Sequence, residues 1–196
     1  MTPDNLTKFN KQARIIGGQT ATSAERATDD FYATDPEAIE HLMKIEKLNK
    51  KIWEPACGMG HLAKPLIREG YEVRCTDIVD RGFGEGGVDF LWTFDDWDGD
   101  IITNPPYRLA EEFIKHGLEI IPNGNKVCMF LKLQFLEGKR RKTLFDIHPP
   151  KRVWVSSGRI KCGANGNFEG CSSMMAQAWY IWEKGYTGET TLRWFN

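Results

Sequence analysis

A short apolar strand, a glycine turn and an amphipathic helix follow one another within residues 51–67, and this succession constrains the fold more than any other feature. The strand is predicted over residues 51–54, Gly58 and Gly60 form the turn, and residues 62–67 have the apolar spacing of a helix. Glycines allow the backbone to approach a ligand closely, and a helix start offers unpaired N–H groups. This arrangement is typical of a nucleotide-binding site. Neither a phosphate loop nor a dinucleotide site is indicated, because Gly-Lys-Ser/Thr and a third glycine are missing.

A second strand, predicted over residues 72–76, is followed by an acidic residue, Asp77. This residue comes about twenty positions after the glycine turn, where nucleotide-binding folds place a partner for the ribose hydroxyls. We therefore expect Asp77 to bind a ribose. The alternative is that its carboxylate caps a helix or a turn.

The strand predicted over residues 100–103 leads into a tetrapeptide whose members are Asn104, Pro105, Pro106 and Tyr107. The exocyclic amine of adenine is a poor nucleophile, because its lone pair is delocalised into the ring. The carbonyls of the Asn104 side chain and the Pro105 backbone can each accept one N–H of this amine and so localise the lone pair. Proline has no N–H and holds the preceding residue extended, and the Tyr107 ring can stabilise positive charge on the nitrogen. Alternatively, the prolines only end the strand and Tyr107 packs nearby.

The glycine turn, Asp77 and the Asn-Pro-Pro-Tyr tetrapeptide together resemble the motifs of the S-adenosylmethionine-dependent N6-adenine DNA methyltransferases, in particular small forms from phages and prophages. The resemblance extends to residues 30–36 and 88–91 and covers about residues 29–135. It implies an enzyme that transfers a methyl group from S-adenosyl-L-methionine to the N6 amine of adenine in DNA. The tetrapeptide would supply the catalytic residues.

The same resemblance implies a set of residues that bind the cofactor. Tyr32, Thr34 and Glu54 are assigned to its methionine part, and Asp89 is assigned to its adenine. For Tyr32 and Thr34 the alternative is a buried aromatic and an N-cap before a helix, and for Ile78 it is core burial. The complete set is Tyr32, Thr34, Glu54, Ala56, Gly58, Gly60, Asp77, Ile78, Asp89 and Phe90.

The substrate is less constrained than the reaction. Glutamine methylases of protein release factors share the Asn-Pro-Pro-Tyr tetrapeptide, but they carry a helical domain ahead of the cofactor fold, whereas only a polar leader precedes Phe31 here. This difference favours DNA. Methylation of adenine in RNA or of a protein glutamine remains the enzymatic alternative, and a nucleic-acid-binding module that only retains the fold is a third reading.

The remaining pattern predicts the fold class. Strands are predicted over residues 51–54, 72–76, 87–91, 100–103, 126–135 and 152–155, helices over 36–48, 62–67, 111–121 and 138–145, and a closing hairpin from 174–183 and 190–195. Strands that alternate with helices indicate an α/β, doubly wound, mostly parallel Rossmann-like sheet with a C-terminal antiparallel hairpin strand. We expect a flexible N-terminal arm over residues 1–28, a methyltransferase domain over residues 29–196 and no separate target-recognition domain. Lys132 or Gln134 is predicted to face the pocket.

Size and cysteine content exclude several classes of protein. A chain of 196 residues with 41% hydrophobic residues suits one domain with a sizeable core. It has neither an apolar run of about eighteen residues nor a signal-peptide pattern, so we expect a cytoplasmic protein without membrane contact. The five cysteines are odd in number and form no Cys-x-x-Cys pair, which favours reduced thiols and no bound metal.

A basic stretch bears on the partner. Between residues 126 and 161 there are ten Lys or Arg residues and two acidic ones. Phosphate contacts with DNA, or with RNA, are predicted for Lys139, Arg140, Arg141 and Lys142. The alternative is a solvated helix face. Residues 158–170 are predicted as an irregular loop that serves either base recognition or plain connection, and the oligomeric state is not indicated.

Overall fold

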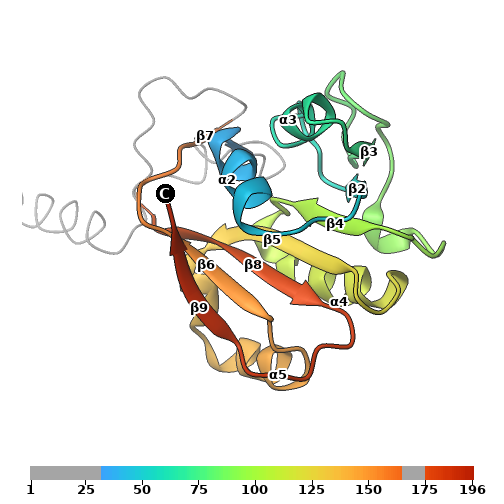
Figure 1. The fold of residues 1–196 in the computed structure, drawn as a ribbon. Helices are drawn as coiled ribbons and strands as arrows, with labels where there is room; N and C mark the ends of the chain where they lie inside the picture. The colour runs from blue at the N-terminus through green and yellow to red at the C-terminus, as the bar shows by residue number, and fades with distance from the viewer. Residues whose placement is uncertain (1–31, 165–174) are drawn as a thin grey trace, which may run out of the picture.

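The computed structural model describes residues 32–164 and 175–196, which form a seven-stranded mixed sheet with helices on both faces and a separate two-stranded sheet (Figure 1). The strands are β1 (Tyr32–Thr34), β2 (Lys51–Glu54), β3 (Glu72–Cys75), β4 (Asp100–Thr103), β5 (Lys126–Lys132), β6 (Arg152–Ser156), β7 (Cys162–Ala164), β8 (Gln177–Glu183) and β9 (Thr191–Phe195). The helices are α2 (Glu37–Ile45), α3 (Ala63–Arg68), α4 (Ala110–Ile120) and α5 (Lys139–Ile147). The arm predicted over residues 1–28 lies outside the described residues.

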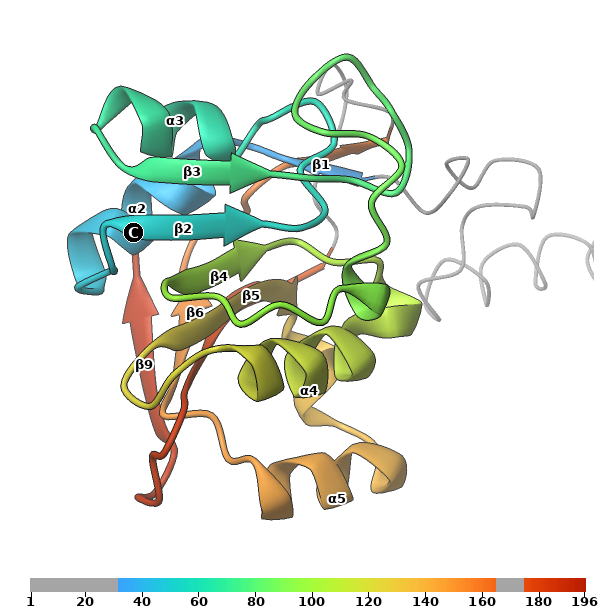
Figure 2. The ribbon, with the colours of Figure 1, turned by 90° about the vertical axis from the view of Figure 1, so that its right-hand side faces the viewer.

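The large sheet has the strand order β3-β2-β4-β5-β8-β6-β9. Strand β8 is antiparallel to both of its neighbours, and every other neighbouring pair is parallel. The fold class predicted from the sequence is therefore confirmed, including an antiparallel strand from the C-terminal part of the chain. Because β3 and β4 lie on opposite sides of β2, the winding reverses between β2 and β4, and open α/β sheets bind ligands at such a point. Figure 2 shows β2, β3 and β4 running the same way, with their following loops at one edge.

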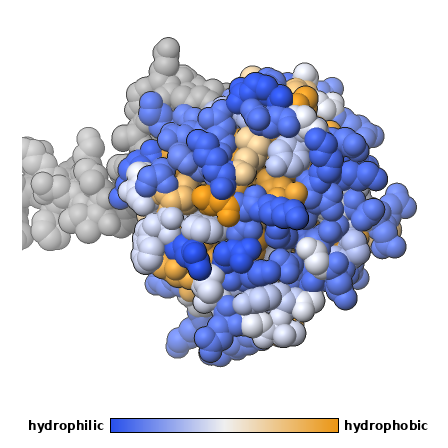
Figure 3. Space-filling model, viewed as in Figure 1, coloured by the Kyte–Doolittle hydropathy of each residue, from blue (hydrophilic) through white to orange (hydrophobic). Residues whose placement is uncertain are grey.

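Two hydrophobic layers hold the helices against the sheet. Helices α2 and α3 cover one face, while α4 and α5 cover the other (Figures 1 and 2). Strand β5 contacts both layers, so residues 127–131 are all buried, which explains why this segment is continuously apolar. In the view of Figure 3 the surface is mainly hydrophilic, with small separate hydrophobic patches. Across the residues placed in the structure, no helix is both long and apolar enough to span a bilayer.

The strand predicted over residues 87–91 is wrong. Residues Phe90–Trp92 instead form a short 3-10 helix, and the Asp89 carboxylate accepts a hydrogen bond from the Leu91 N–H at 3.0 Å. A side chain that binds the backbone two residues ahead turns the chain out of an extended conformation. The strand predicted over residues 126–135 also ends early, because pairing with β8 stops at Lys132 and residues Leu133–Leu136 form another 3-10 helix.

The predicted C-terminal hairpin is also wrong in its pairing. Both of its strands exist, as β8 and β9, but β6 lies between them and is hydrogen-bonded to each. This insertion pairs both edges of β6 and so satisfies its backbone groups on both sides. In the segment predicted as an irregular loop, residues 162–164 form β7, which is antiparallel to β1. Residues 165–170 of that loop lie outside the described residues.

A buried carboxylate joins α2 to the distant part of the sheet. Glu46, at the C-terminal end of α2, accepts hydrogen bonds from the Arg152 guanidinium and from the Trp154 indole N–H, the latter at 2.8 Å. The Lys126 ammonium lies 3.8 Å from its second oxygen. Burial acts to raise the pKa of Glu46, but the hydrogen bonds from Arg152 and Trp154 outweigh it, so the pKa is lowered from its usual 4.5.

We expect Glu46→Ala to lower the free energy of unfolding by about 2–3 kcal/mol, because it leaves Arg152 without its buried partner, although that arginine keeps some solvent contact. The melting temperature should fall by roughly 4–10 °C in thermal denaturation at pH 7. Because the folded pKa is lowered, the difference should be full above about pH 4.5 and shrink as the pH falls through that pKa. Glu119→Ala on exposed α4 surface is the control and should change stability by less than about 0.5 kcal/mol. Equal effects of both changes would contradict this role.

Candidate active site

A pocket lies at the point where the winding of the sheet reverses. Its walls come from the end of β1, the turn after β2, the segment after β3, residues 88–90 and the tetrapeptide after β4. The predicted site residues that line it are Thr34, Glu54, Ala56, Asp77, Ile78, Asp89, Phe90, Asn104, Pro105, Pro106 and Tyr107. Gly58 and Gly60 lie in the turn beside the lining, and the Tyr32 backbone pairs with Ala164 in the small sheet. The fold thus brings the predicted residues to one place from five segments of the chain.

The glycine turn has a backbone that side chains would disturb. Gly58 and Gly60 have φ angles of 54° and 78°, in the left-handed region that favours glycine. A methyl group on Gly60 would also lie 2.4 Å from the Phe83 ring. The turn is tied to the next strand, since the Cys57 N–H donates to the Thr76 carbonyl at 3.0 Å. Its conformation therefore depends on β3 as well as on its own glycines.

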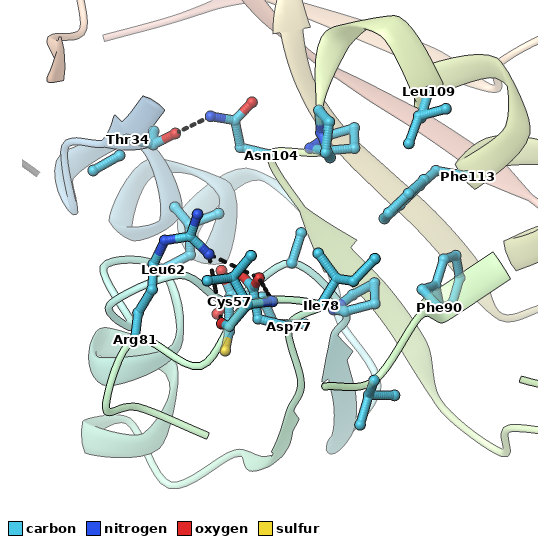
Figure 4. A pocket seen from close by; sticks show the side chains of 18 of the residues that line it. Thr34, Cys57, Leu62, Asp77, Ile78, Arg81, Phe90, Asn104, Leu109 and Phe113 are labelled. Atoms are coloured by element: carbon cyan, nitrogen blue, oxygen red, sulfur yellow. Dashed lines mark hydrogen bonds and ion pairs between the residues drawn. The ribbon is translucent and has the colours of Figure 1, made fainter. Parts of the chain in front are cut away.

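Asp77 organises the loops around the pocket. One of its oxygens accepts the Gly58 N–H at 2.8 Å, and the other accepts the Val79 N–H at 2.9 Å. The second oxygen also accepts a hydrogen bond from the Arg81 guanidinium at 3.0 Å (Figure 4). Asp77 thus makes the backbone contacts of a turn cap, which was the alternative to ribose binding. The contact with Arg81 was not predicted, although an acid and a base four residues apart are a signal that could have indicated it.

Glu54 places a second carboxyl group in the same pocket. Only 2% of this residue is exposed, and no donor in the described part of the chain hydrogen-bonds to its Oε2 atom. Burial raises the pKa of Glu54 well above its usual value, the charge of Asp77 raises it further, and the Ala63 N–H opposes both effects. Two acidic groups around a cavity, one with an oxygen that lacks a donor, suit a ligand that carries a positively charged or hydrogen-bond-donating group.

An apolar wall faces these carboxyl groups. Phe90 is held edge-on against the Trp53 ring, with ring centroids 5.2 Å apart, and it also contacts Phe113. Ile78 remains 61% exposed, which argues against the alternative that it belongs to the core. In Figure 4, Ile78, Phe90 and Phe113 lie on one side of the pocket, and Asp77 with Arg81 lies on another. A flat ligand with polar edges fits this division.

The tetrapeptide forms the pocket wall nearest to β1. The Asn104 Nδ2 atom donates a hydrogen bond to the Thr34 hydroxyl at 2.9 Å, and the Asn104 oxygen points away from Thr34 (Figure 4). The Lys132 ammonium lies 4.5 Å from the centroid of the Tyr107 ring, close enough for a cation–π contact. Lys132 is thus the member of the predicted pair that reaches this region. Thr34 contacts the tetrapeptide, which the sequence alone did not indicate.

Cys57 lies in the turn but is poorly suited to act as a nucleophile. Burial raises the pKa of its thiol to about 12, and the nearby charge of Glu54 adds to this effect. A thiolate is the reactive form of cysteine, so the Cys57 side chain is a neutral thiol at physiological pH. Within residues 32–164 and 175–196, no group of three or more His, Cys, Asp or Glu side chains is arranged to hold a metal ion.

The four basic residues assigned to phosphate lie at the start of α5. The Arg141 guanidinium carbon lies 5.0 Å from the centroid of the Phe135 ring, and the guanidinium donates a hydrogen bond to the Gln134 carbonyl. The Lys142 ammonium donates a hydrogen bond to the Asp146 carboxylate at 2.6 Å. Arg140 is 82% exposed and lies 3.8–3.9 Å from two carboxylates of α4. Local contacts therefore engage Arg141 and Lys142 most closely, and the contacts of Arg140 are longer.

Comparisons with known proteins define the class of fold. No protein-family description and no curated protein sequence matches this chain. Solved structures do: a proposed class I S-adenosylmethionine-dependent methyltransferase from Listeria monocytogenes matches with a TM-score of 0.58 and 14% identity, over 95% of this chain and 71% of that one. A proposed RNA methyltransferase from Pyrococcus horikoshii matches with a TM-score of 0.59 and 13% identity, over 90% of this chain and 98% of that one. An S-adenosylmethionine-dependent O-methyltransferase from Thermotoga maritima matches with a TM-score of 0.51 and 12% identity, over 79% of this chain and 66% of that one. The chain has the fold of the class I methyltransferases.

The pH dependence of stability should report on Glu54. Because its pKa is raised in the folded protein, the free energy of unfolding of the wild type should fall as the pH rises from the usual value of 4.5 through the folded pKa. Glu54→Gln removes this titration. We therefore expect the melting temperature of the variant, relative to wild type, to increase between pH 4.5 and 8. Exposed Glu119→Gln should show a constant difference, and a constant difference for Glu54→Gln would contradict the assignment.

Proposed function

We propose that this protein is an S-adenosylmethionine-dependent methyltransferase that methylates the N6 amine of adenine in DNA. The observation that carries the proposal is the position of the Asn104–Tyr107 tetrapeptide, which borders a pocket at the reversal point of a methyltransferase fold. The pocket also contains Glu54 and Asp77, the two acidic residues expected to hold the cofactor. A non-enzymatic module would have no need to keep both sets of residues together.

The residues around the pocket fit S-adenosyl-L-methionine. Glu54, with an oxygen that lacks a donor, suits the ammonium group of the methionine part. Asp77 and the glycine turn suit the ribose, and Asp89 with the apolar side chains of Ile78 and Phe90 suits the adenine. When bound, the cofactor supplies an electrophilic methyl group attached to a positively charged sulfur.

The tetrapeptide prepares the amine that accepts this methyl group. The Asn104 side-chain carbonyl and the Pro105 backbone carbonyl each accept one N–H of the target amine, which directs its lone pair outward. That pair forms the new N–C bond while the C–S bond breaks and its electrons go to sulfur, and one amine proton then leaves to solvent. The Tyr107 ring stabilises the positive charge on nitrogen during transfer. No strong base is required.

The substrate assignment rests on the chain itself. The tetrapeptide suits adenine, and a basic stretch follows β5 on the same edge of the sheet as the pocket. An adenine in a duplex must be flipped out of the stack to reach Asn104. Adenine in RNA is the second candidate, favoured by the likeness to the proposed RNA methyltransferase from Pyrococcus horikoshii. A protein glutamine is the third, because its amide nitrogen needs the same two acceptors.

Asn104→Ala tests the catalytic assignment. We expect methyl transfer to fall by at least roughly a hundredfold, because one of the two acceptors that activate the amine is lost, while the dissociation constant for S-adenosylmethionine changes by less than about threefold. Transfer of a labelled methyl group and calorimetric titration of the cofactor measure the two quantities. Asn123→Ala, in an exposed turn, is the control. Full turnover of Asn104→Ala would contradict the mechanism.

The substrate itself is tested with wild-type protein. Unmethylated duplex DNA, single-stranded DNA, RNA and a glutamine-containing peptide are each incubated with labelled S-adenosylmethionine, and the products are hydrolysed and identified. N6-methyladenine in DNA supports the proposal. N6-methyladenine in RNA alone or methylglutamine would replace the substrate, and absence of cofactor binding would exclude the enzyme.

The basic residues predict a salt dependence. Lys139→Gln with Arg140→Gln removes two exposed charges of the set and leaves the close contacts of Arg141 and Lys142 in place. If both side chains contact phosphates, a plot of the logarithm of the DNA association constant against the logarithm of the salt concentration should become less steep by about 2, at roughly 0.9 per lost contact. Lys184→Gln is the control, because Lys184 follows the end of β8 that is remote from Lys132 and the pocket. An unchanged slope in the double variant would show that this surface does not hold DNA.

A further inference from the structure

A line of hydrogen bonds extends behind the catalytic asparagine into the small sheet. It begins at Asn104, whose Nδ2 atom donates to the Thr34 hydroxyl at 2.9 Å. Thr34 is only 2% exposed and lies at the end of β1, seventy residues away in sequence. Two segments that are remote in the chain are thus joined by a buried contact at the pocket wall.

The line continues through Cys162 to Gln177. Cys162 stands directly opposite Thr34 in the antiparallel pairing of β1 with β7. Burial raises the pKa of the Cys162 thiol, and the neighbouring Thr34 hydroxyl opposes this effect as a donor to the sulfur. The Gln177 Nε2 atom, at the start of β8, donates to the same sulfur at 2.8 Å. Gln177 is 4% exposed, so its side chain is shielded from water and must find its hydrogen-bond partners within the protein. The Cys162 thiol is one of these partners.

The direction of these bonds decides which way the Asn104 amide faces. A threonine hydroxyl has one proton, and when it donates that proton to Cys162, it can only accept from Asn104. It therefore selects the Nδ2 atom and directs the Asn104 oxygen the opposite way, as Figure 4 shows. The two ends of an asparagine amide have nearly the same shape, so packing alone distinguishes them poorly. A flipped amide would present N–H groups to the N–H groups of the substrate amine.

We infer that Thr34, Cys162 and Gln177 form a hydrogen-bond relay that holds the Asn104 carboxamide in the orientation needed to accept from the substrate amine. Cys162 and Gln177 are positioning residues in this arrangement, and they act through Thr34 without touching the reacting atoms. The inference deepens the proposed function, because the orientation matters only if the Asn104 oxygen accepts from an amine. It also gives β1 and β7 a role in catalysis.

Kinetics with and without the relay provide the first test. Thr34→Val, Cys162→Ala and Gln177→Leu each remove one link, and we expect kcat to fall roughly tenfold for each, with less than about a twofold change in the dissociation constant for S-adenosylmethionine. Thr34→Ser keeps the hydroxyl and should recover most of the activity lost in Thr34→Val. Cys75→Ala removes a half-buried thiol outside the relay and is the control. Weaker cofactor binding with unchanged kcat in Thr34→Val would overturn the relay in favour of a cofactor contact.

A second test reads the amide directly and does not depend on activity. In nitrogen-15 NMR of the cofactor-free protein, the side-chain amide signals of Asn104 are identified by their loss in Asn104→Asp. We expect them to shift or broaden in Cys162→Ala and Gln177→Leu and to stay in place in Cys75→Ala. Unchanged signals in both relay variants would overturn the inference. Shifted signals in a protein that methylates no substrate would support the relay and refute the proposed function, so the two failures are distinguishable.

Discussion

Burial of three adjacent parallel strands on both faces is the constraint on which the site depends. Strands β2, β4 and β5 lie between two helical layers, so their backbone groups are satisfied by pairing with neighbouring strands, and the three strands run in a common direction. Their carboxyl ends then meet at one edge, and the reversal of winding beside β2 opens that edge to a ligand. The glycine turn and the tetrapeptide are neighbours for this reason, although 44 residues separate Gly60 from Asn104.

The charge distribution within that edge is uneven. Glu54 and Asp77 are buried close enough for the charge of one to affect the other. Arg81 and two backbone N–H groups compensate Asp77, whereas the Ala63 N–H acts on Glu54. Glu54 therefore retains an unmet requirement for a donor, which a bound cation satisfies. Lys132 lies on the other side of the tetrapeptide, over Tyr107. The pocket thus offers acidic groups to the proposed cofactor, and Lys132 places a positive charge on Tyr107 outside the residues that line it.

The small sheet of β1 and β7 is hydrogen-bonded both to Asn104 in the tetrapeptide and to Gln177 in the large sheet. It is only three residues long in each strand, yet it places Thr34 against Asn104 and Cys162 against Thr34. Short strands of this kind have little stability of their own. Their position is set by the bonds they make to the large sheet, including the one from Gln177, so Asn104 and the small sheet order each other.

The sequence by itself determined the elements whose signals are local. The strand before the glycine turn, Asp77 after the next strand, the tetrapeptide after the strand at residues 100–103 and the apolar faces of α2 and α4 could all be predicted, since each depends on residues close together in the chain. Tertiary structure decided the rest. The insertion of β6 between β8 and β9 and the contacts of Thr34 and Lys132 with the tetrapeptide depend on partners far away in sequence. The bend at Asp89 is local, but the mostly apolar run over residues 88–91 concealed it. Pairing of strand edges and the direction of buried hydrogen bonds are properties of the assembled sheet, and no local pattern of residues encodes them.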